Sequence, residues 1–457
     1  MNIGVVGLGK VGFPFAVAIA RYWGQGQVYC YDTNVALVDG YKAGDMGPCT
    51  GEWLLPQLFE QCKDEMILDA SLERLTNESE IVFICVQTPH PPNHDGSVPL
   101  GDWIGDFDYQ YLVQACRDVI QSASRAAASK TLAIISTVTP GTMRLQVDPI
   151  CQESGVGGPV EHWNVCYNPL FVSLGEVIKR VTKPPLILIG CEDSEQGRHL
   201  AEFWDSYPVL VDPGKKMTRR VESWETVEIA KLAINCFQGM KVVFANSLLE
   251  ISESLGGDCD RVSDILKKSP DVVGPSFLSP GMGVGGPCLP RDMRAMAYTY
   301  EHLCAGRANL FEELAFLREQ QARFIAALPL SPKFANPSIP RIILCPNYKV
   351  GHRSSEGSAA LLVGHYIKEG GYRVLYYDPF DKGPFPSEQA VYIIGSPDPH
   401  LGELPYVLGS LIVDLWGLFS EAPTGCQLYS VGRRRDGGEK HNTFLPDKGL
   451  PSRATPL

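Results

Sequence analysis

Residues 3–12 read IGVVGLGKVG, and this stretch decides the fold of the N-terminal part of the chain. Four apolar residues, Ile3–Val6, are followed at once by the pattern G-x-G-x-x-G and then by a helix-like run. In a βαβ unit the first glycine makes a tight turn, the second lets a pyrophosphate approach the backbone, and the third lets the helix pack closely on the strand. The stretch therefore predicts a dinucleotide-binding loop at a helix N-terminus, made by Gly7, Gly9, Lys10, Val11 and Gly12.

An acidic residue, Asp32, lies 20 residues after Gly12, at the end of the next expected strand. A carboxylate in this place accepts hydrogen bonds from the hydroxyls of the adenosine ribose. It would repel the 2′-phosphate of NADP, and the following Thr33 and Asn34 supply no arginine to offset that repulsion. We therefore expect NAD as the cofactor.

Up to residue 211 the chain alternates short apolar runs with stretches of helical length. The expected strands are residues 2–6, 27–31, 81–86, 132–136, 165–167, 186–190 and 209–211. Strands rich in Val and Ile and separated by helices are typical of a doubly wound parallel sheet. Residues 89–107, crowded with Pro, Gly and Asp, are expected to form a long surface loop.

Two polar loops, residues 87–89 and 136–142, follow strands of this expected sheet. Ligands of open α/β sheets bind beyond the carboxyl ends of the strands. Thr88 and Thr137 are therefore candidates to bind a cofactor ribose, a nicotinamide amide or a water molecule. Each loop alone would suit a cap or a turn equally well.

Residues 225–255 contain no proline and one glycine, Gly239. Apolar residues recur there at helical spacing: Ile229, Leu232, Cys236, Met240 and Val243. A helix of about 30 residues spans roughly 45 Å, which is longer than a small domain needs. We expect this helix to link two domains and to pack on a second copy of itself in a homodimer.

A linker rich in proline precedes a second alternating block, whose expected strands are residues 342–345, 373–377, 391–394 and 411–413. Its expected helix, Ala359–Glu369, is closed by Gly370 and Gly371. The predicted fold is α/β, with two Rossmann-like doubly wound domains joined by the long central helix and a helical middle domain. The expected domains are residues 1–211, 212–328 and 329–432, followed by a disordered tail, 433–457.

The 457-residue chain has a formal net charge of -12, with 44% hydrophobic and 20% charged residues. This acidic balance gives no general attraction to nucleic acid or to an anionic membrane. No apolar run approaches the roughly 20 residues needed to cross a bilayer, and the N-terminus shows no signal peptide. We expect a cytoplasmic protein without nucleic-acid or membrane partners. The 14 cysteines form no C-x-x-C pair, so no metal site is expected.

Cys288 lies in the run GVGGPCLPRD, residues 283–292. A phosphate or a developing oxyanion could accept hydrogen bonds from the backbone N–H groups of Gly281, Gly283, Gly285 and Gly286. Arg291 can favour the thiolate, and Asp292 can move a proton or orient a water molecule. A nucleophilic cysteine together with a dinucleotide site suggests an oxidation through a covalent intermediate. The alternative is a buried thiol in a glycine-rich loop.

Lys231 and Asn235 are four residues apart on the expected long helix and so share a face, with Glu228 one turn earlier. An ammonium and an amide that point into one cleft can stabilise an alkoxide, an aldehyde oxygen or a tetrahedral thiohemiacetal. A solvated helix face would give the same pattern.

Together these residues resemble the nucleotide-sugar dehydrogenase family, which includes UDP-glucose 6-dehydrogenases and GDP-mannose dehydrogenases. The family's cysteine motif reads G-x-G-G-x-C-L-P-K-D, and the resemblance spans about residues 2–420 in the same order of motifs. It implies a four-electron, NAD-dependent oxidation of a nucleotide-sugar C6 alcohol to a uronic acid. The acid would form through a thiohemiacetal and a thioester on Cys288, with UDP-glucose as the commonest substrate.

The resemblance also implies roles for individual residues. Lys231 would stabilise the oxyanion, Asn235 and Asp292 would place water and protons, and Thr137 would belong to the catalytic set. The nucleotide-sugar would be held by Lys231 and Asn235 together with Phe277, Gly285 and Lys349.

Several positions depart from the family pattern. The family has the segment P-E-F-L-R-E-G, and this chain has leucine in place of both glutamates, at Leu170 and Leu174. Those glutamates assist proton transfer and thioester hydrolysis, so the final step is the one affected; Asp292, Glu176 or a hydroxyl could take over. The other departures replace two arginines and a lysine: Val272, Glu356 and Arg291. Two alternatives stay open: a binding or regulatory relative without turnover, and a two-electron hydroxyacid dehydrogenase, which has no use for Cys288.

Overall fold

The computed structural model describes residues 1–90, 95–99, 105–123, 130–155, 163–207, 218–304, 307–351, 354–381 and 383–434. The chain forms two compact units. Unit 1 comprises Met1–Pro89 and Asp106–Leu232, and unit 2 comprises His90–Gly105 and Ala233–Leu457. The expected strand at 209–211 and the expected tail from residue 435 onward lie outside the described residues. The three expected domain boundaries stay predictions.

Unit 1 is built on an eight-stranded sheet of order β3-β2-β1-β4-β5-β6-β7-β8. The strands are β1 (Ile3–Val6), β2 (Val28–Tyr31), β3 (Met66–Ile67), β4 (Ile81–Ile84), β5 (Lys130–Ile134), β6 (Trp163–Tyr167), β7 (Ile187–Gly190) and β8 (Arg219–Glu222). Neighbouring strands are parallel, except that β7 runs antiparallel to β6, with Tyr167 opposite Gly190. The expected doubly wound sheet is confirmed, but the reversal at β7 was not expected.

The sequence missed two strands of this sheet, both at its edges. β3 has only two residues, and β8 reads RRVE with its side chains alternately half-buried and exposed. Neither contains the apolar run by which a buried strand is found, and charged residues are typical of an edge strand. The expectation of six apolar strands was therefore correct for the interior of the sheet.

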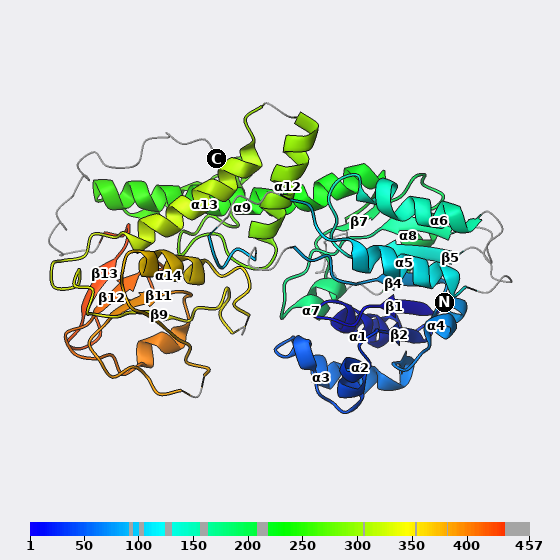
Figure 1. Cartoon of the computed structure of the whole chain (residues 1–457), viewed down its shortest axis with the longest axis horizontal. Coiled ribbons are helices and arrows are strands. Elements are labelled where there is room, and N and C mark those ends of the chain that lie inside the picture. The colour runs from blue at the N-terminus through cyan, green and yellow to red at the C-terminus, as the bar shows by residue number, and fades with distance from the viewer. Residues whose placement is uncertain are drawn as a thin grey trace. The chain divides into compact units, whose positions relative to one another are not determined.

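Helices cover both faces of this sheet (Figure 1). One hydrophobic cluster joins the sheet to α1 (Gly12–Trp23), α3 (Leu55–Cys62), α7 (Val177–Thr182) and α8 (Arg198–Ser206). A second cluster, on the opposite face, joins it to α4 (Leu72–Glu78), α5 (Gln110–Gln121), α6 (Asp148–Gly155) and the start of α9 (Trp224–Leu255). Because β1 lies between β2 and β4, the strand order switches there, and the loops after β1 and β4 both begin at this point.

The expected long helix is confirmed as α9, Trp224–Leu255. Its one glycine has a packing reason, because a Cβ on Gly239 would lie 2.8 Å from the sulfur of Met293 on α12 (Leu289–Cys304). Among the described helices, α9 is the one long and apolar enough to cross a membrane, with 44% of its most apolar stretch buried inside the protein. The core helix of a water-soluble protein passes the same test, so this is weak evidence for a membrane span.

Unit 2 contains a five-stranded parallel sheet of order β10-β9-β11-β12-β13. Its strands are β9 (Arg341–Leu344), β10 (Val374–Tyr377), β11 (Val391–Ile394), β12 (Leu411–Asp414) and β13 (Gln427–Ser430). The expected helix is confirmed as α14, Ala359–Glu369. The sequence missed β13 alone among these elements. Hydrophobic clusters lie on both faces of the sheet, so the second expected α/β block is confirmed.

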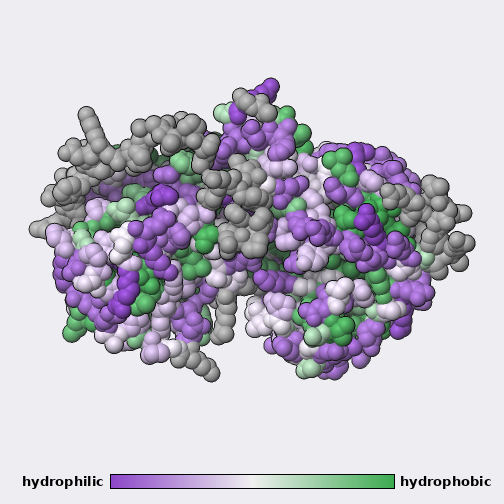
Figure 2. Space-filling view, viewed as in Figure 1, coloured by the Kyte–Doolittle hydropathy of each residue, from purple (hydrophilic) through white to green (hydrophobic). Residues whose placement is uncertain are grey.

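The remaining helices of unit 2 are α10 (Cys259–Lys267), α11 (Pro270–Val273) and α13 (Leu310–Ala326). The first residues of the expected tail are anchored on this unit, since Arg433 donates hydrogen bonds to both carboxylate oxygens of Asp260, at 2.6 and 2.9 Å. On the face seen in Figure 2 hydrophilic residues predominate, as expected for the acidic composition.

The expected surface loop at residues 89–107 is only partly described, and the prediction was wrong at Gly96. Gly96 is buried, and a Cβ there would lie 2.8 Å from Pro290. Its carbonyl accepts a hydrogen bond from Arg318 of α13. Gly96 therefore belongs to the packed interior of unit 2, for which a loop composition gives no signal.

Candidate active site

The glycine loop after β1 leaves room for a ligand at one of its three glycines. A Cβ on Gly12 would lie 1.8 Å from the carbonyl oxygen of Gly7, and a Cβ on Gly7, whose φ is +90°, would lie 2.9 Å from the backbone of Cys85. At Gly9, by contrast, no heavy atom of the described residues lies within 4 Å of the Cβ position. Two glycines serve close packing, and the third faces open space that a pyrophosphate can fill.

Asp32 is fixed at the end of β2 by this loop. Its two carboxylate oxygens accept hydrogen bonds from the backbone N–H groups of Leu8, at 2.7 Å, and Asn34, at 2.8 Å. The hydroxyl of Tyr41 holds the loop from the other side by donating to the Leu8 carbonyl, at 2.8 Å. The carboxylate therefore lies next to the glycine loop, as the ribose of a bound dinucleotide requires, and these residues fit NAD.

The two expected threonine loops of unit 1 meet. The Thr88 hydroxyl donates to the carbonyl of Thr137 at 2.8 Å, and the Ser136 hydroxyl donates to the carbonyl of Val86 at 2.6 Å. Thr88 is buried and Thr137 is half-buried. The two loops thus form one polar edge beyond β4 and β5.

Glu228, which precedes Lys231 by one turn of α9, is fully buried and ties α9 to the second threonine loop. Its carboxylate accepts hydrogen bonds from the N–H groups of Gly141, at 2.6 Å, and Met143, at 2.7 Å. Burial raises the pKa of Glu228 to about 7, although these two hydrogen bonds act in the opposite direction. The carboxylate therefore holds the loop through peptide donors.

Lys231 is buried, so the interpretation of a solvated helix face is wrong for this residue. Its ammonium donates to the carbonyl of Leu170 at 2.8 Å and lies 4.7 Å from the centre of the Phe171 ring. Lys231 is thus held against the segment in which leucines replace the family's glutamates. The Leu170 side chain packs on the hydrophobic cluster of unit 1. Glu176, at the end of this segment, forms ion pairs with Lys179 and Arg180.

Cys288 stands immediately before α12 in unit 2, and its carbonyl accepts the hydrogen bond of the Asp292 N–H at 2.8 Å. Its thiol is therefore at the N-terminus of a 16-residue helix, where the helix dipole favours a thiolate. Cys288 is half-buried, unlike Cys236, which is fully buried and whose thiol pKa is raised by that burial. The position suits a nucleophile better than a structural thiol.

Asp292 is fully buried below Cys288, and both of its oxygens are held. The Asn235 amide donates to Oδ2 at 2.6 Å, and Nε of Arg291 donates to Oδ1 at 2.8 Å. Burial alone would lower the pKa of Arg291, but the negative charges of Asp292, Cys288 and Glu356 raise it above its usual range. The structure thus brings Asn235, Arg291 and Asp292 together, one helical turn from Cys288.

The loop of residues 281–288, called the cysteine loop below, packs on the carboxyl end of the second sheet. The N–H of Gly286 donates to the carbonyl of Gly357 at 3.0 Å, and Gly286 also meets the Tyr348 ring. A Cβ on Gly281 would lie 2.4 Å from Trp416, which follows β12. Only glycine allows these approaches. The contact with Gly357 places the cysteine loop beside the N-terminus of α14.

The other expected ligand-binding residues of unit 2 lie around this loop or in solvent. Lys349 is half-buried, in the loop after β9 and next to Tyr348. Phe277 is 45% exposed with a φ of +62°. Val272, at the position of the family's arginine, is 86% exposed.

Arg318 of α13 is a buried residue of this half of the site that the sequence did not indicate. Its Nε donates to the carbonyl of Val284 in the cysteine loop at 2.8 Å, and its Nη2 donates to the carbonyl of Gly96. Among the described residues its Nη1 has no hydrogen-bond partner. A single arginine in an amphipathic helix carries no sequence signal of such a role.

The expected site residues thus fall into two groups. The glycine loop, Asp32, Thr88, Thr137 and Lys231 belong to unit 1, and Asn235, Phe277, Gly285, Cys288, Asp292 and Lys349 belong to unit 2. Within each unit neighbouring members are in contact, and the helix α9 carries both Lys231 and Asn235. Their roles in binding and catalysis stay predictions.

Comparisons with known proteins identify the family of the chain. A model of the UDP-glucose/GDP-mannose dehydrogenase family, NAD binding domain, matches residues 1–207, and a model of the family's central domain matches residues 225–314. GDP-mannose 6-dehydrogenase of Azotobacter vinelandii is 27% identical over 93% of this chain and 98% of its own length. UDP-glucose 6-dehydrogenase of Gallus gallus is 24% identical over 86% of this chain and 76% of its own length.

Solved structures share the fold at low identity. A UDP-glucose dehydrogenase from the hyperthermophilic archaeon Pyrobaculum islandicum has a TM-score of 0.79, with 24% identity over 95% of this chain and 98% of that one. A UDP-D-ManNAc dehydrogenase from Pyrococcus horikoshii has a TM-score of 0.75, with 23% identity over 95% and 99% of the two chains. With two family models that together match most of the chain, it belongs to the UDP-glucose/GDP-mannose dehydrogenase family of NAD-dependent oxidoreductases.

Proposed function

We propose that this protein oxidises the C6 alcohol of a nucleotide-sugar to the uronic acid, in two steps, through a thioester on Cys288. The observation that carries the proposal is the position of Cys288 at the N-terminus of α12, above a buried Asp292 that is held by Arg291 and Asn235. A helix N-terminus and a neighbouring guanidinium both favour the thiolate, which is the nucleophilic form of cysteine. A hydroxyacid dehydrogenase would have no use for this arrangement.

The residues of the chain have separable tasks in this proposal. NAD⁺, bound by residues 7–12 and Asp32, supplies the hydride acceptor for both oxidations. Lys231 stabilises the alkoxide that forms when the C6 hydroxyl loses its proton, and Cys288 then adds to the aldehyde carbon to give a thiohemiacetal. Oxidation of the thiohemiacetal gives the thioester, and water releases the acid. Asn235 orients Asp292, which keeps Arg291 next to the thiol.

The nucleotide diphosphate needs local donors, because the chain as a whole is acidic. The cysteine loop beside the N-terminus of α14 offers backbone N–H groups, and Ser358 caps this helix by accepting from the Leu361 N–H at 3.3 Å. Lys349, on the adjoining loop, adds a cation. We propose UDP-glucose as the first substrate to test, with GDP-mannose next because relatives named for both sugars match this chain.

We also propose a homodimer formed through the central helix. Five large apolar residues of α9 are between 47% and 73% exposed: Ile229, Phe237, Phe244, Ile251 and Leu255. Their spacing of four, seven and eight residues places them on one face of the helix, which in a monomer would meet water. Sedimentation of the wild type as a monomer at micromolar concentration would contradict this proposal. The expected cytoplasmic location stays a prediction.

The proposed reaction is tested with a panel of UDP- and GDP-sugars, monitored by NADH absorbance and by mass spectrometry of the product. We expect two NADH per sugar and a uronic acid with the wild type, and no acid with Cys288→Ala. The replacement of both glutamates by Leu170 and Leu174 favours a second candidate, a relative that binds without turnover. Calorimetric binding of a nucleotide-sugar without NADH formation would support that candidate. One NADH per molecule in both proteins would indicate a two-electron dehydrogenase.

A further inference from the structure

The thioester in the proposed reaction needs a carboxylate that can activate water, and two obvious positions do not supply one. Leu170 and Leu174 occupy the glutamate positions, and the Leu170 side chain packs on the hydrophobic cluster of unit 1. Asp292 is fully buried, with Asn235 on one oxygen and Arg291 on the other. Both oxygens of this buried carboxylate already accept hydrogen bonds, so Asp292 is poorly placed to take a proton from water.

Another carboxylate, Glu356, lies beside the cysteine loop in the same unit. Residues 354–358 are the last part of the connection from β9 to α14, and Gly357 is fixed there between two neighbours. The Gly357 carbonyl accepts from the N–H of Gly286 at 3.0 Å, and its own N–H donates to Oδ2 of Asp95 at 3.4 Å. A Cβ on Gly357 would lie 2.1 Å from the Gly286 carbonyl oxygen. Glu356 is thus fixed one residue from the contact with Gly286, and Gly286 is two residues from Cys288.

Charge and exposure at Glu356 suit a general base. The negative charges of Cys288 and Glu356 both act on the Arg291 guanidinium, so the carboxylate and the sulfur lie near the same cation. Glu356 is also half-buried, whereas Asp292 is fully buried, so water can reach the Glu356 carboxylate.

We propose that Glu356 activates the water that hydrolyses the Cys288 thioester, in place of the glutamates that Leu170 and Leu174 have replaced. The proposal rests on the proposed function. Water oxygen adds to the thioester carbon while a water proton passes to the Glu356 carboxylate. The carbon–sulfur bond then breaks, and the sulfur leaves as a thiolate at the N-terminus of α12. The carboxylic acid ionises, and Glu356 returns its proton to solvent, so the step requires no further oxidant or reductant.

The test is a comparison of burst and steady-state kinetics in E356Q, with UDP-glucose or GDP-mannose as the probe, whichever the wild type oxidises. We expect a burst of two NADH per active site as in the wild type, followed by turnover reduced by roughly 10²- to 10⁴-fold, the range of general base catalysis. Intact-mass spectrometry after the burst should find the sugar acyl group on Cys288. Hydroxylamine, which cleaves thioesters without a protein base, should release it.

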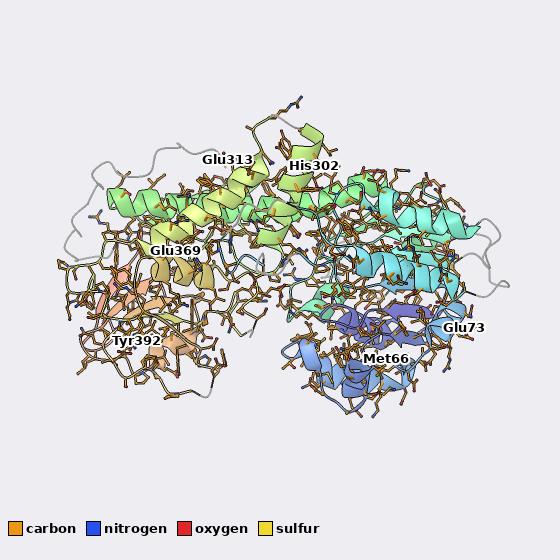
Figure 3. All side chains as sticks on the ribbon, in the orientation of Figure 1. Met66, Glu73, His302, Glu313, Glu369 and Tyr392 are labelled. Atoms are coloured by element: carbon orange, nitrogen blue, oxygen red, sulfur yellow. The ribbon has the colours of Figure 1, made fainter. Side chains whose placement is uncertain are left out.

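Two further variants separate chemistry from folding. Glu356→Asp keeps a carboxylate and should recover at least tenfold of the lost turnover, while Glu369→Gln, at the exposed end of α14 (Figure 3), should match the wild type. The inference is overturned if E356Q turns over within twofold of the wild type, or if E356Q and Glu356→Asp both lose the burst together with turnover. A wild type that reduces no NAD⁺ with any sugar would overturn the proposed function as well, whereas an active wild type with an unaffected E356Q would overturn this inference alone.

Discussion

The two glycine-rich loops, residues 7–12 in unit 1 and 281–286 in unit 2, follow the same physical rule with different neighbours. Each lies at the carboxyl end of parallel strands and brings backbone close to other backbone. The neighbours of Gly12 are Gly7, in the same loop, and Cys85, which follows β4 and is also a neighbour of Gly7. Those of Gly281 and Gly286 are Trp416, Tyr348 and Gly357, far away in the sequence. The first loop is therefore held partly by a contact within itself, whereas these contacts of the second loop all depend on the assembled unit.

The substitution Gly12→Ala should break the first loop, and its expected effect on stability is larger than that of any other change to either loop. The added Cβ would lie 1.8 Å from the Gly7 carbonyl, and neither backbone can move without separating α1 from β1. We expect the free energy of unfolding to fall by about 3 kcal/mol or more, since overpacking against backbone exceeds the usual cost of overpacking a core. Urea unfolding followed by fluorescence measures the change. A variant with wild-type stability would show that α1 and β1 can separate at this glycine without cost.

The substitution Arg318→Met tests whether the second loop depends on long-range contacts. It removes the donors to the carbonyls of Val284 and Gly96 while filling a similar volume. Each buried carbonyl left without a donor has a cost, so we expect a loss of about 2–3 kcal/mol in the free energy of unfolding. Alkylation of Cys288 by iodoacetamide should become faster as the cysteine loop loosens.

A matched control for this variant is Arg323→Met on the same helix. Arg323 is 54% exposed and lies 3.9 Å from Glu369, so its loss should cost less than about 1 kcal/mol. Equal effects of the two substitutions would contradict the assignment of Arg318 as the residue that fixes the loop.

Sequence separation explains which parts could be predicted from the sequence. The glycine loop, Asp32 and the helix α9 follow from spacing, because strand, turn and helix are adjacent in the chain. The contacts of Asp292 with Asn235, of Gly286 with Gly357 and of Arg318 with Gly96 join distant segments. No local pattern encodes such contacts. The run around Cys288 suggested a nucleophile, and the resemblance to a family added the roles of its partners.

Edge strands and reversals were missed for a related reason. β3 and β8 lack apolar runs because one side of an edge strand meets no neighbour, and the direction of β7 depends on the connection from β6. The residue Glu228 was noted for its helical spacing, but its burial was not expected. Its partners, Gly141 and Met143, lie more than 80 residues earlier in the chain.

Glu228 provides a pH-dependent test in unit 1, where a carboxylate holds the turn at Gly141. Its folded-state pKa of about 7 lies above the ordinary value of 4.5. The folded state therefore binds more protons than the unfolded state between these values, and stability falls as the pH rises through that range. We expect the titration of Glu228 to lower the free energy of unfolding of the wild type by about 2 kcal/mol between roughly pH 5.5 and 8.

Urea unfolding at both pH values measures this slope, and Glu228→Gln should remove it. Glu225→Gln is the control, because the Arg144 guanidinium lowers the pKa of Glu225 and moves its titration below this range. A Glu228→Gln protein whose stability falls with pH as steeply as the wild type would show that Glu228 does not titrate there.

Gly9→Ala should have the smallest effect on stability, and it makes the comparison between the glycines of one loop sharper. No heavy atom of the described chain lies within 4 Å of its Cβ position, so the free energy of unfolding should change by less than about 0.5 kcal/mol. The methyl group would instead occupy the space in which the pyrophosphate approaches the backbone. We expect the Kd for NAD⁺, measured by calorimetry, to rise at least about tenfold, or 1.4 kcal/mol. Gly402→Ala, another open position in the described chain, should leave both quantities unchanged. Unchanged NAD⁺ affinity in Gly9→Ala would mean that the open space above Gly9 is not where the cofactor binds, even though Gly12 remains essential for the fold.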